Sequence, residues 1–101
     1  MIVLLKESKF PPEINRALDA LGQENRRNII TIIINKKNIC FSDLLDNTNL
    51  NSSTLNFHLK ELMKASLINN FYSKSENPGR KYSYYELTDF GKDICKALGI
   101  K

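Results

Sequence analysis

The pattern of apolar and polar positions is clearest in the middle of the chain. Leu55, Leu59 and Leu62 recur at the spacing of one helix face, and Leu67 continues the stripe just beyond the expected helix end. The opposite side carries small polar, aromatic and basic residues, namely Ser53, Asn56, Phe57, Lys60 and Lys64. The pattern therefore predicts a helix over residues 52–66 that packs on the protein with one face and offers the other to a nucleic acid.

A shorter helix is predicted just before this one. If it begins at Ser42, the hydroxyl of that serine would accept a hydrogen bond from the first turn. Residues 47–49, Asn-Thr-Asn, are poor in a helix interior and good in a turn. Asn51 or Ser52 would then cap the longer helix. Residues 42–66 are thus predicted to form a helix-turn-helix, and the alternative is an ordinary helical hairpin in a small core.

Two short strands around a loop are predicted to follow. Aromatic residues, which favour strands, recur on both sides of Ser75–Gly79, whose Asn-Pro-Gly sequence indicates a turn. Lys74 precedes the loop, and Arg80 and Lys81 follow it. A basic hairpin after such a helix is typical of a wing, so residues 69–87 are predicted to form one. The alternative is a solvated hairpin with surface charge.

The remaining segments predict a helical platform. The isoleucines of residues 29–34 would suit a strand by propensity, but Ile29, Ile30 and Ile33 have helical spacing, so we expect a helix. The expected elements are a helix from Pro12 that Gly22 ends, a helix from Gln23 that residues 36–38 break, a strand over 39–41 beside the wing, and a helix capped by Thr88 over 88–99. The fold class is therefore mainly α with a small β-hairpin.

Composition fits one globular domain, residues 1–101, with an N-terminal arm over residues 1–11. The net charge of +4 and the isoelectric point near 9.1 are compatible with a polyanionic partner, although many proteins with such a charge bind none. Apolar runs are too short to cross a bilayer and no secretory signal is recognised, so we expect no membrane association. Two cysteines, Cys40 and Cys95, fit a reduced cytoplasmic protein better than a disulfide scaffold.

Three segments, taken in order, carry a family resemblance. They are Ala17–Gly22 with Arg26–Ile30, then Ser53–Leu62, then Gly79–Lys81 with Tyr84–Thr88 and Gly91. Together they resemble the leading segment, the recognition helix and the wing of winged helix-turn-helix regulators of the arsenical-resistance-repressor (ArsR) type, in the form common among small archaeal regulators. The resemblance covers about residues 17–98. It implies DNA binding and dimerisation through the first and last helices.

Catalytic and metal chemistry find little support. His58 is the single histidine, and its place near the apolar stripe favours a hydrogen-bonded packing residue over a base or a ligand. Metal-sensing ArsR proteins often carry a C-x-C pair just before the first motif helix, where this chain has one cysteine in Cys40-Phe41-Ser42. We interpret Cys40 and Cys95 as small buried apolar residues rather than redox or metal groups. We expect no enzyme activity, no cofactor and no metal site.

These patterns predict a sequence-specific transcription regulator that binds double-stranded DNA. The longer helix would enter the major groove, and the wing would reach the adjacent minor groove. Phe57 would contact thymine methyls or sugars, or lean on the first motif helix. The predicted DNA-binding residues are Ser52, Ser53, Thr54, Asn56, Phe57, Lys60, Lys64, Lys74, Arg80 and Lys81. The alternative is a protein-interaction module without DNA binding, which should show a contiguous apolar patch on the outer face of this helix.

The chain ends are the predicted homodimer contacts. Met1–Leu5 is an apolar run, and the final segment offers Ile94, Leu98 and Ile100. Left in water, these would be exposed apolar groups on a small protein. One recognition helix covers only a few base pairs, so specific binding normally needs two half-sites related by a two-fold axis. The alternative is a monomer in which both segments pack on their own core.

Overall fold

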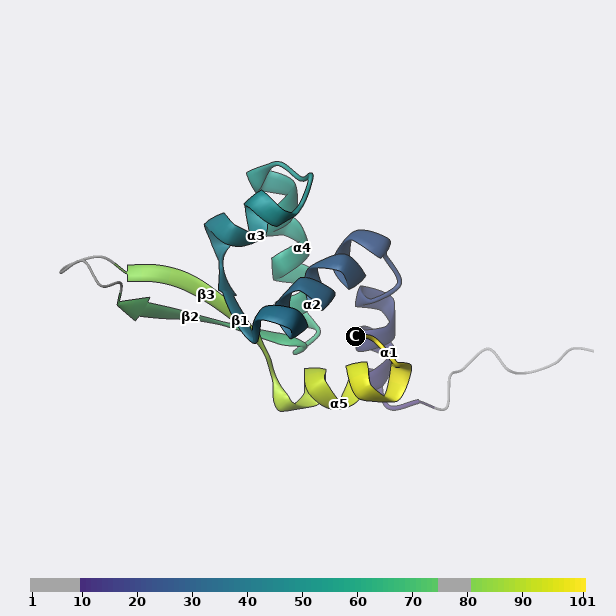
Figure 1. Cartoon of the computed structure of the whole chain (residues 1–101). Coiled ribbons are helices and arrows are strands. Elements are labelled where there is room, and N and C mark those ends of the chain that lie inside the picture. Colours follow the sequence, from purple (N-terminus) through teal and green to yellow (C-terminus); the bar gives the residue numbers. More distant parts are fainter. Residues whose placement is uncertain (1–9, 75–80) are drawn as a thin grey trace, which may run out of the picture.

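The computed structural model describes residues 10–74 and 81–101, so most of the predicted N-terminal arm lies outside the described residues. Five helices and three strands are present in the described ranges (Figure 1). In chain order they are α1 (Pro12–Ala20), α2 (Glu24–Lys36), β1 (Asn38–Cys40), α3 (Phe41–Asn47), α4 (Ser52–Lys64), β2 (Ile68–Lys74), β3 (Lys81–Leu87) and α5 (Asp89–Leu98). None of the described helices is long and apolar enough to cross a membrane.

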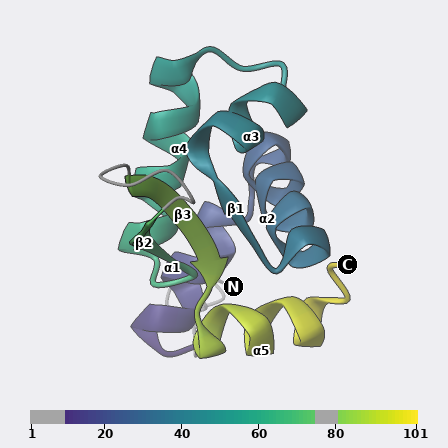
Figure 2. The same ribbon diagram turned by 60° about the vertical axis from the view of Figure 1, so that its left-hand side comes forward.

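The three strands form one antiparallel sheet in the order β1-β3-β2. Ile39 of β1 lies opposite Tyr85 of β3, and β2 pairs with β3 along its full length. The β2–β3 hairpin projects away from the helices, whereas β1 lies beside its base (Figures 1 and 2). The strand expected over residues 39–41 is confirmed with a shift of one residue. It anchors the base of the hairpin to the segment that leads into α3.

The core lies between the helices and the base of the sheet. The largest fully buried side chains are Ile29, Ile30, Ile33, Leu44, Leu55, Leu59, Leu62 and Leu67. Burying each of these stabilises the fold by roughly 1.5–3 kcal/mol, which outweighs a helix-propensity penalty of at most about 0.7 kcal/mol for a β-branched residue. The helix predicted for the isoleucine-rich segment is therefore confirmed as α2.

The start of α1 is confirmed and the helix ends just before Gly22, but the predicted glycine cap is wrong. Pro12 occupies the beginning of the helix, where a missing N–H does no harm. The helix ends at Ala20 with Leu21 as its cap, and Gly22 does not have the positive φ of a glycine cap. A side chain of α2 instead pairs with a free carbonyl group at this end of α1, because Arg27 Nη1 donates to the Leu21 carbonyl at 2.8 Å.

The predicted start of α3 is also wrong. The helix begins at Phe41, and its cap position, Cys40, makes no side-chain hydrogen bond to the first turn. Ser42 lies inside the helix with its hydroxyl oxygen 3.4 Å from the sulfur of Cys40. Cys40 is also the last residue of β1, so the extended strand conformation runs directly into the helix and leaves no room for a serine cap.

The two ends of α4 are both specified locally. Of the two predicted caps, Asn51 is the one used, since its Oδ1 accepts from the Thr54 N–H at 2.8 Å. At the other end Ser66 takes the left-handed conformation, with φ of 61°. The Leu67 N–H then reaches back to the Leu62 carbonyl at 3.1 Å, which closes a Schellman-type cap. These bonds fix where the helix begins and ends.

The entry to α5 is closely packed. Thr88 caps the helix as predicted, because its Oγ1 accepts from the Gly91 N–H at 2.8 Å. The same hydroxyl donates to the Ser66 carbonyl at 2.7 Å, which joins α5 to the end of α4. A Cβ on Gly91 would lie 2.2 Å from the Leu67 carbonyl oxygen, so this position requires glycine. Both views place α5 at the opposite end of the molecule from the α3–α4 turn (Figures 1 and 2).

Candidate nucleic-acid interface

The two predicted faces of α4 are present. Its buried side consists of Leu55, His58, Leu59 and Leu62. Thr54 is half-buried, and the exposed side chains of the helix are Ser52, Ser53, Asn56, Phe57, Lys60 and Lys64. Short polar groups thus lie at the N-terminal end of the outer face and lysines lie farther along, whereas the core side is almost entirely apolar. The buried side supports the fold, and most outer side chains are available for a partner.

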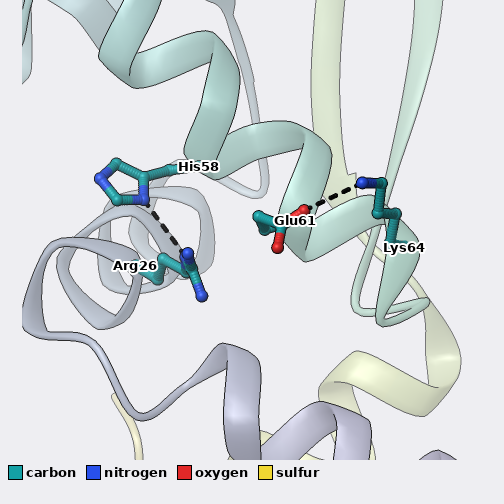
Figure 3. Close-up of polar contacts among 4 residues, drawn as sticks. All are labelled: Arg26, His58, Glu61 and Lys64. Atoms are coloured by element: carbon teal, nitrogen blue, oxygen red, sulfur yellow. Dashed lines mark hydrogen bonds and ion pairs between the residues drawn. The ribbon is translucent and has the colours of Figure 1, made fainter.

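The two lysines on this face differ. Lys64 Nζ lies 3.2 Å from Glu61 Oε2, one turn earlier on the same helix (Figure 3). Lys64 remains largely exposed, so this pair stabilises the helix by less than about 1 kcal/mol. Among the described residues, Lys60 has no carboxylate within ion-pair distance. Lys60 is therefore the cation on the outer face of α4 whose charge is not offset by an adjacent acid.

His58 is a buried, hydrogen-bonded packing residue, as predicted. Its side chain is 5% exposed, and its Nδ1 accepts from Arg26 Nε at 3.2 Å (Figure 3). Accepting this bond requires a lone pair on Nδ1, hence a neutral imidazole with its proton on Nε2. Burial, and to a smaller extent the Arg26 charge, lower the pKa of His58 below its usual value. The hydrogen bond and the pKa direction both indicate a neutral ring.

Arg26 makes the buried contact behind α4 that the sequence did not reveal. It is only 7% exposed, and its Nη1 also donates to the Ala20 carbonyl at 3.4 Å, so it joins α1, α2 and α4. A pocket of about 240 Å³ beside it is lined in part by Asp19 and Glu61. Nearby carboxylates offset part of the desolvation of a buried cation. The sequence placed Arg26 in the family resemblance but gave no sign of its partner 32 positions away.

Phe57 lies beside this pair. Its ring makes an edge contact with His58, with centroids 5.6 Å apart, and the Arg26 guanidinium carbon lies 5.7 Å from the ring centroid. The side chain is nevertheless 54% exposed. These two contacts join Phe57 to α2 and to its own helix, and the predicted alternatives of a DNA contact or packing on the first motif helix stay predictions.

The base of the wing is ordered by polar and aromatic contacts. Asn70 Nδ2 donates to Ser83 Oγ at 2.6 Å, and the Phe71 and Tyr84 rings stack with centroids 5.7 Å apart. Both contacts join β2 to β3 and fix the register of the hairpin. Tyr72 is 69% exposed on the same hairpin and was not among the predicted site residues. The alternation of a strand pattern indicates two faces but does not show how far out along a hairpin the core extends.

Two of the three predicted wing cations lie at the outer end of the described hairpin strands. Lys74 and Lys81 are backbone partners at the end of the β2–β3 ladder. The loop Ser75–Gly79 and Arg80 lie outside the described residues. The structure therefore brings the backbone of two predicted cations to one end of the hairpin, and their contact with DNA stays a prediction.

The cysteines are both free. Cys95 is buried as predicted, and burial raises the pKa of its thiol. Cys40 is half-buried rather than buried. Within residues 10–74 and 81–101, no three His, Cys, Asp or Glu side chains gather as a metal site would require. The expected lack of a metal sensor stays a prediction.

Residues 23–69 match the sequence pattern of a family described as winged helix-turn-helix DNA-binding. This segment runs from the cap of α2 through α4 into β2, and β3 then completes the wing. The chain has a winged helix-turn-helix fold. The predicted fold class, mainly α with a small hairpin, is thereby confirmed, and the third strand extends it.

Several solved structures have a similar fold. A transcriptional regulator homologue from Pyrococcus horikoshii aligns with a TM-score of 0.68 and 21% identity, over 88% of this chain and 89% of that chain. The reduced form of the regulator YodB from Bacillus subtilis aligns at 0.73 and 18%, over 89% and 85%. HlyU from Vibrio cholerae aligns at 0.71 and 22%, over 91% and 94%.

These comparisons support the winged helix-turn-helix fold and do not single out the ArsR type. Similar structures include regulators described as ArsR, MarR and PadR family members, at 15%, 18% and 25% identity. Since several regulator types fit the same fold, the ArsR type stays a prediction. No curated protein matches the sequence at a significant level.

Proposed function

We propose that this winged helix-turn-helix protein is a non-enzymatic, cytoplasmic regulator of transcription that binds specific sites in double-stranded DNA. The observation that carries the proposal is the outer face of α4, which is exposed, polar and basic while the opposite face is buried. Most surface helices are polar on their outer side, but the exposed side chains of α4 include two lysines and no carboxylate, which suits a polyanionic partner. The family match over residues 23–69 supports the same conclusion.

In this proposal α4 enters the major groove with its N-terminal half. Its 13 residues span about 20 Å, and a major groove about 12 Å wide admits one helix. Ser53 and Asn56 would face base edges, because short polar side chains near the helix start can approach them closely. Lys60 would meet a phosphate, and Lys64 would do so after giving up or sharing its Glu61 contact. The wing would contact the adjacent DNA backbone and minor groove through Lys74, Arg80 and Lys81.

We further propose a homodimer through the chain ends. Leu98 lies four residues after the buried Ile94, on the same side of α5, yet it remains 49% exposed. Since α5 and the α3–α4 turn lie at opposite ends of the molecule, contact through α5 leaves the recognition helix accessible (Figure 2). The apolar run Met1–Leu5 would contribute to the same contact, and it lies outside the described residues.

The alternative is a winged-helix module that binds protein instead of DNA. Such a module would present a contiguous apolar patch on the outer face of α4. On that face, all of which is described, Phe57 is the one large apolar side chain that is exposed, and it is surrounded by serine, asparagine and lysine. The composition of the face therefore favours a polyanionic duplex.

The test is a fluorescence titration of random duplex DNA at several salt concentrations. About 6–10 phosphate contacts per dimer would give a slope of log K against log salt of about −5 to −9. Lys60→Gln should make the slope shallower by about 2, since each dimer loses two contacts. Lys64→Gln should have a smaller effect, because Glu61 already offsets part of its charge.

The matched control is Lys92→Gln, which removes an equal charge from the exposed side of α5. It should leave the slope unchanged if the contact is local to α4. A flat salt dependence of the parent protein, or an equal loss for Lys60→Gln and Lys92→Gln, would contradict the proposal.

A further inference from the structure

The polar and basic character of the outer face of α4 does not account for Phe57. It is large, apolar and 54% exposed, between the exposed polar residues Asn56 and Lys60 on the same face. A phenylalanine that served only the core would be buried, as Leu55 and Leu59 are. Its exposure leaves the ring accessible to a partner on the outer face of α4.

Contacts on the protein side also restrain the Phe57 ring. The edge contact with His58 and the nearby Arg26 guanidinium, 5.7 Å from the ring centroid, restrain it from the protein side. Arg26 is in turn fixed, because it is buried and donates to both His58 Nδ1 and the Ala20 carbonyl. The restraint thus passes from the core through Arg26 to an exposed ring. A side chain that is already ordered loses less entropy when it binds.

Major-groove chemistry limits what an ordered phenyl ring can recognise. Base edges there present hydrogen-bond donors and acceptors, with one apolar group, the C5-methyl of thymine. Placed against any other edge, the ring would cover a polar atom without pairing it, which is unfavourable. The thymine methyl is therefore the feature that an apolar ring at this position can favour.

We propose that Phe57 is a specificity-determining residue that contacts a thymine methyl in each half-site, and that Arg26 positions its ring through the contact with His58. This inference rests on the proposed DNA binding and deepens it by naming one base feature that is recognised. Arg26 itself is too buried to reach DNA, so it acts through the ring and the imidazole.

The experiment begins with selection of preferred sites from a pool of random duplexes by the full chain. Each thymine of a selected site is then replaced by deoxyuridine, which removes the methyl group and leaves every hydrogen-bonding atom in place. At one thymine per half-site the replacement should weaken binding by about three- to tenfold, the effect of one buried methyl group or somewhat more. The remaining thymines should show little change.

Substitutions separate recognition from general affinity. Phe57→Ala should bring the thymine-to-uracil ratio at that position close to one, with little change in melting temperature because the ring is half exposed. Phe57→Leu should retain part of the ratio. Lys60→Gln is the matched control on the same face, and it should weaken binding to both duplexes equally and leave the ratio unchanged.

The positioning role of Arg26 has its own readout. Arg26→Lys keeps the charge but loses the planar group and the Nε donor. It should reduce the thymine-to-uracil ratio while the salt slope stays that of the parent protein, an effect that a purely structural role would not produce. If Arg26→Lys unfolds the protein, His58→Ala removes the same link without changing the charge. If neither Arg26→Lys nor His58→Ala lowers the thymine-to-uracil ratio, Arg26 does not position Phe57.

The outcomes distinguish this inference from the proposal beneath it. Salt-dependent duplex binding with no thymine that responds to uracil, or an unchanged ratio in Phe57→Ala, would overturn the role of Phe57 and leave the proposed DNA binding intact. Absence of binding to any duplex at low salt would overturn both.

Discussion

The helices α4 and α5 follow the same local rules and present different outer surfaces. Each is capped at its N-terminus by a side-chain oxygen, from Asn51 and Thr88, and each ends in a left-handed residue, Ser66 and Gly99. The exposed side chains of α4 are short polar groups, lysines and Phe57, with no carboxylate among them, whereas those of α5 mix aspartates with lysines and include the half-exposed Leu98 near the helix end. In the proposed function these surfaces would meet two kinds of partner, duplex DNA at α4 and a second copy of the chain at α5.

The two helices also differ in how far stability and function can be separated. On α4 the buried and exposed residues lie on opposite sides, so a substitution on one side should leave the other property alone. On α5 the buried Ile94 and the exposed Leu98 belong to one stripe. Substitutions there are expected to affect folding and association together unless they are confined to the end of the helix.

The largest expected effect tests the separation on α4. Leu59→Ala should lower the free energy of unfolding by about 2–5 kcal/mol, because it leaves a cavity in the core. Asn56→Ala should leave that free energy nearly unchanged and reduce discrimination between a selected site and random DNA by ~1–3 kcal/mol. Urea unfolding and competition binding measure the two properties. The reverse outcome, an unfolded Asn56→Ala and an undisturbed Leu59→Ala, would show that the two faces were assigned wrongly.

A second substitution addresses the junction that joins the two helices. Gly91→Ala places a Cβ 2.2 Å from the Leu67 carbonyl oxygen, so α5 must shift away from the end of α4. Overpacking of this kind lowers the free energy of unfolding by about 1–3 kcal/mol, which a small gain in helix propensity offsets only in part. Ala97→Gly is a comparison on the exposed side of α5, where only propensity is lost. If Gly91→Ala were as stable as the parent chain, the close packing of this junction would be wrong.

The third prediction concerns the surface of α5. Leu98→Gln should weaken homodimerisation by roughly 1 kcal/mol per subunit, or about 30-fold in the dimer Kd, since about half of a leucine side chain is available for burial. Sedimentation equilibrium measures the change. Lys60→Gln serves as the converse control, because it should reduce DNA affinity and leave association unchanged. A parent chain that is monomeric at tens of micromolar and binds a palindromic site one to one would contradict the dimer.

The smallest expected effect is the contribution of His58 to the pH dependence of the free energy of unfolding. Its pKa is lowered in the folded protein, chiefly by burial and then by Arg26, while an unfolded histidine titrates near pH 6.5. The unfolded chain therefore binds the proton first as the pH falls. The stabilisation that the neutral His58 gives above pH 6.5 is lost as the pH drops from the unfolded pKa through the lower folded pKa. His58→Asn, which retains an acceptor for Arg26, should reduce the decline in stability between pH 7.5 and 5.5. An identical decline in both proteins would assign it to other groups.

Much of the fold could be predicted because it depends on local signals. The spacing of Leu55, Leu59 and Leu62 and the caps at Asn51 and Thr88 each act within a few residues. The two errors, at Ser42 and Gly22, arose where a tertiary contact replaced a local one. At the first the strand β1 runs directly into α3, and at the second arginines of α2 finish α1.

The sequence could predict which residues of α4 lie on its outer face, but not the buried contacts behind that face. Helical spacing suffices to place Asn56 and Lys60 outward. The hydrogen bond between Arg26 and His58 joins positions 32 apart, and no pattern within one segment reveals such a pair. The Glu61–Lys64 ion pair was in reach of sequence reasoning, since residues three apart are neighbours on a helix.

The central claim is that the outer face of α4 and the wing contact duplex DNA while α5 does not. Amide chemical-shift mapping of the isotopically labelled protein, titrated with a selected duplex at low salt, tests this directly. Shifts should concentrate in residues 52–64 and in the hairpin strands β2 and β3, with those of residues 89–98 nearly unchanged. Shifts that concentrate in α5 and leave α4 unchanged, or no shifts at a saturating concentration of duplex, would contradict the account.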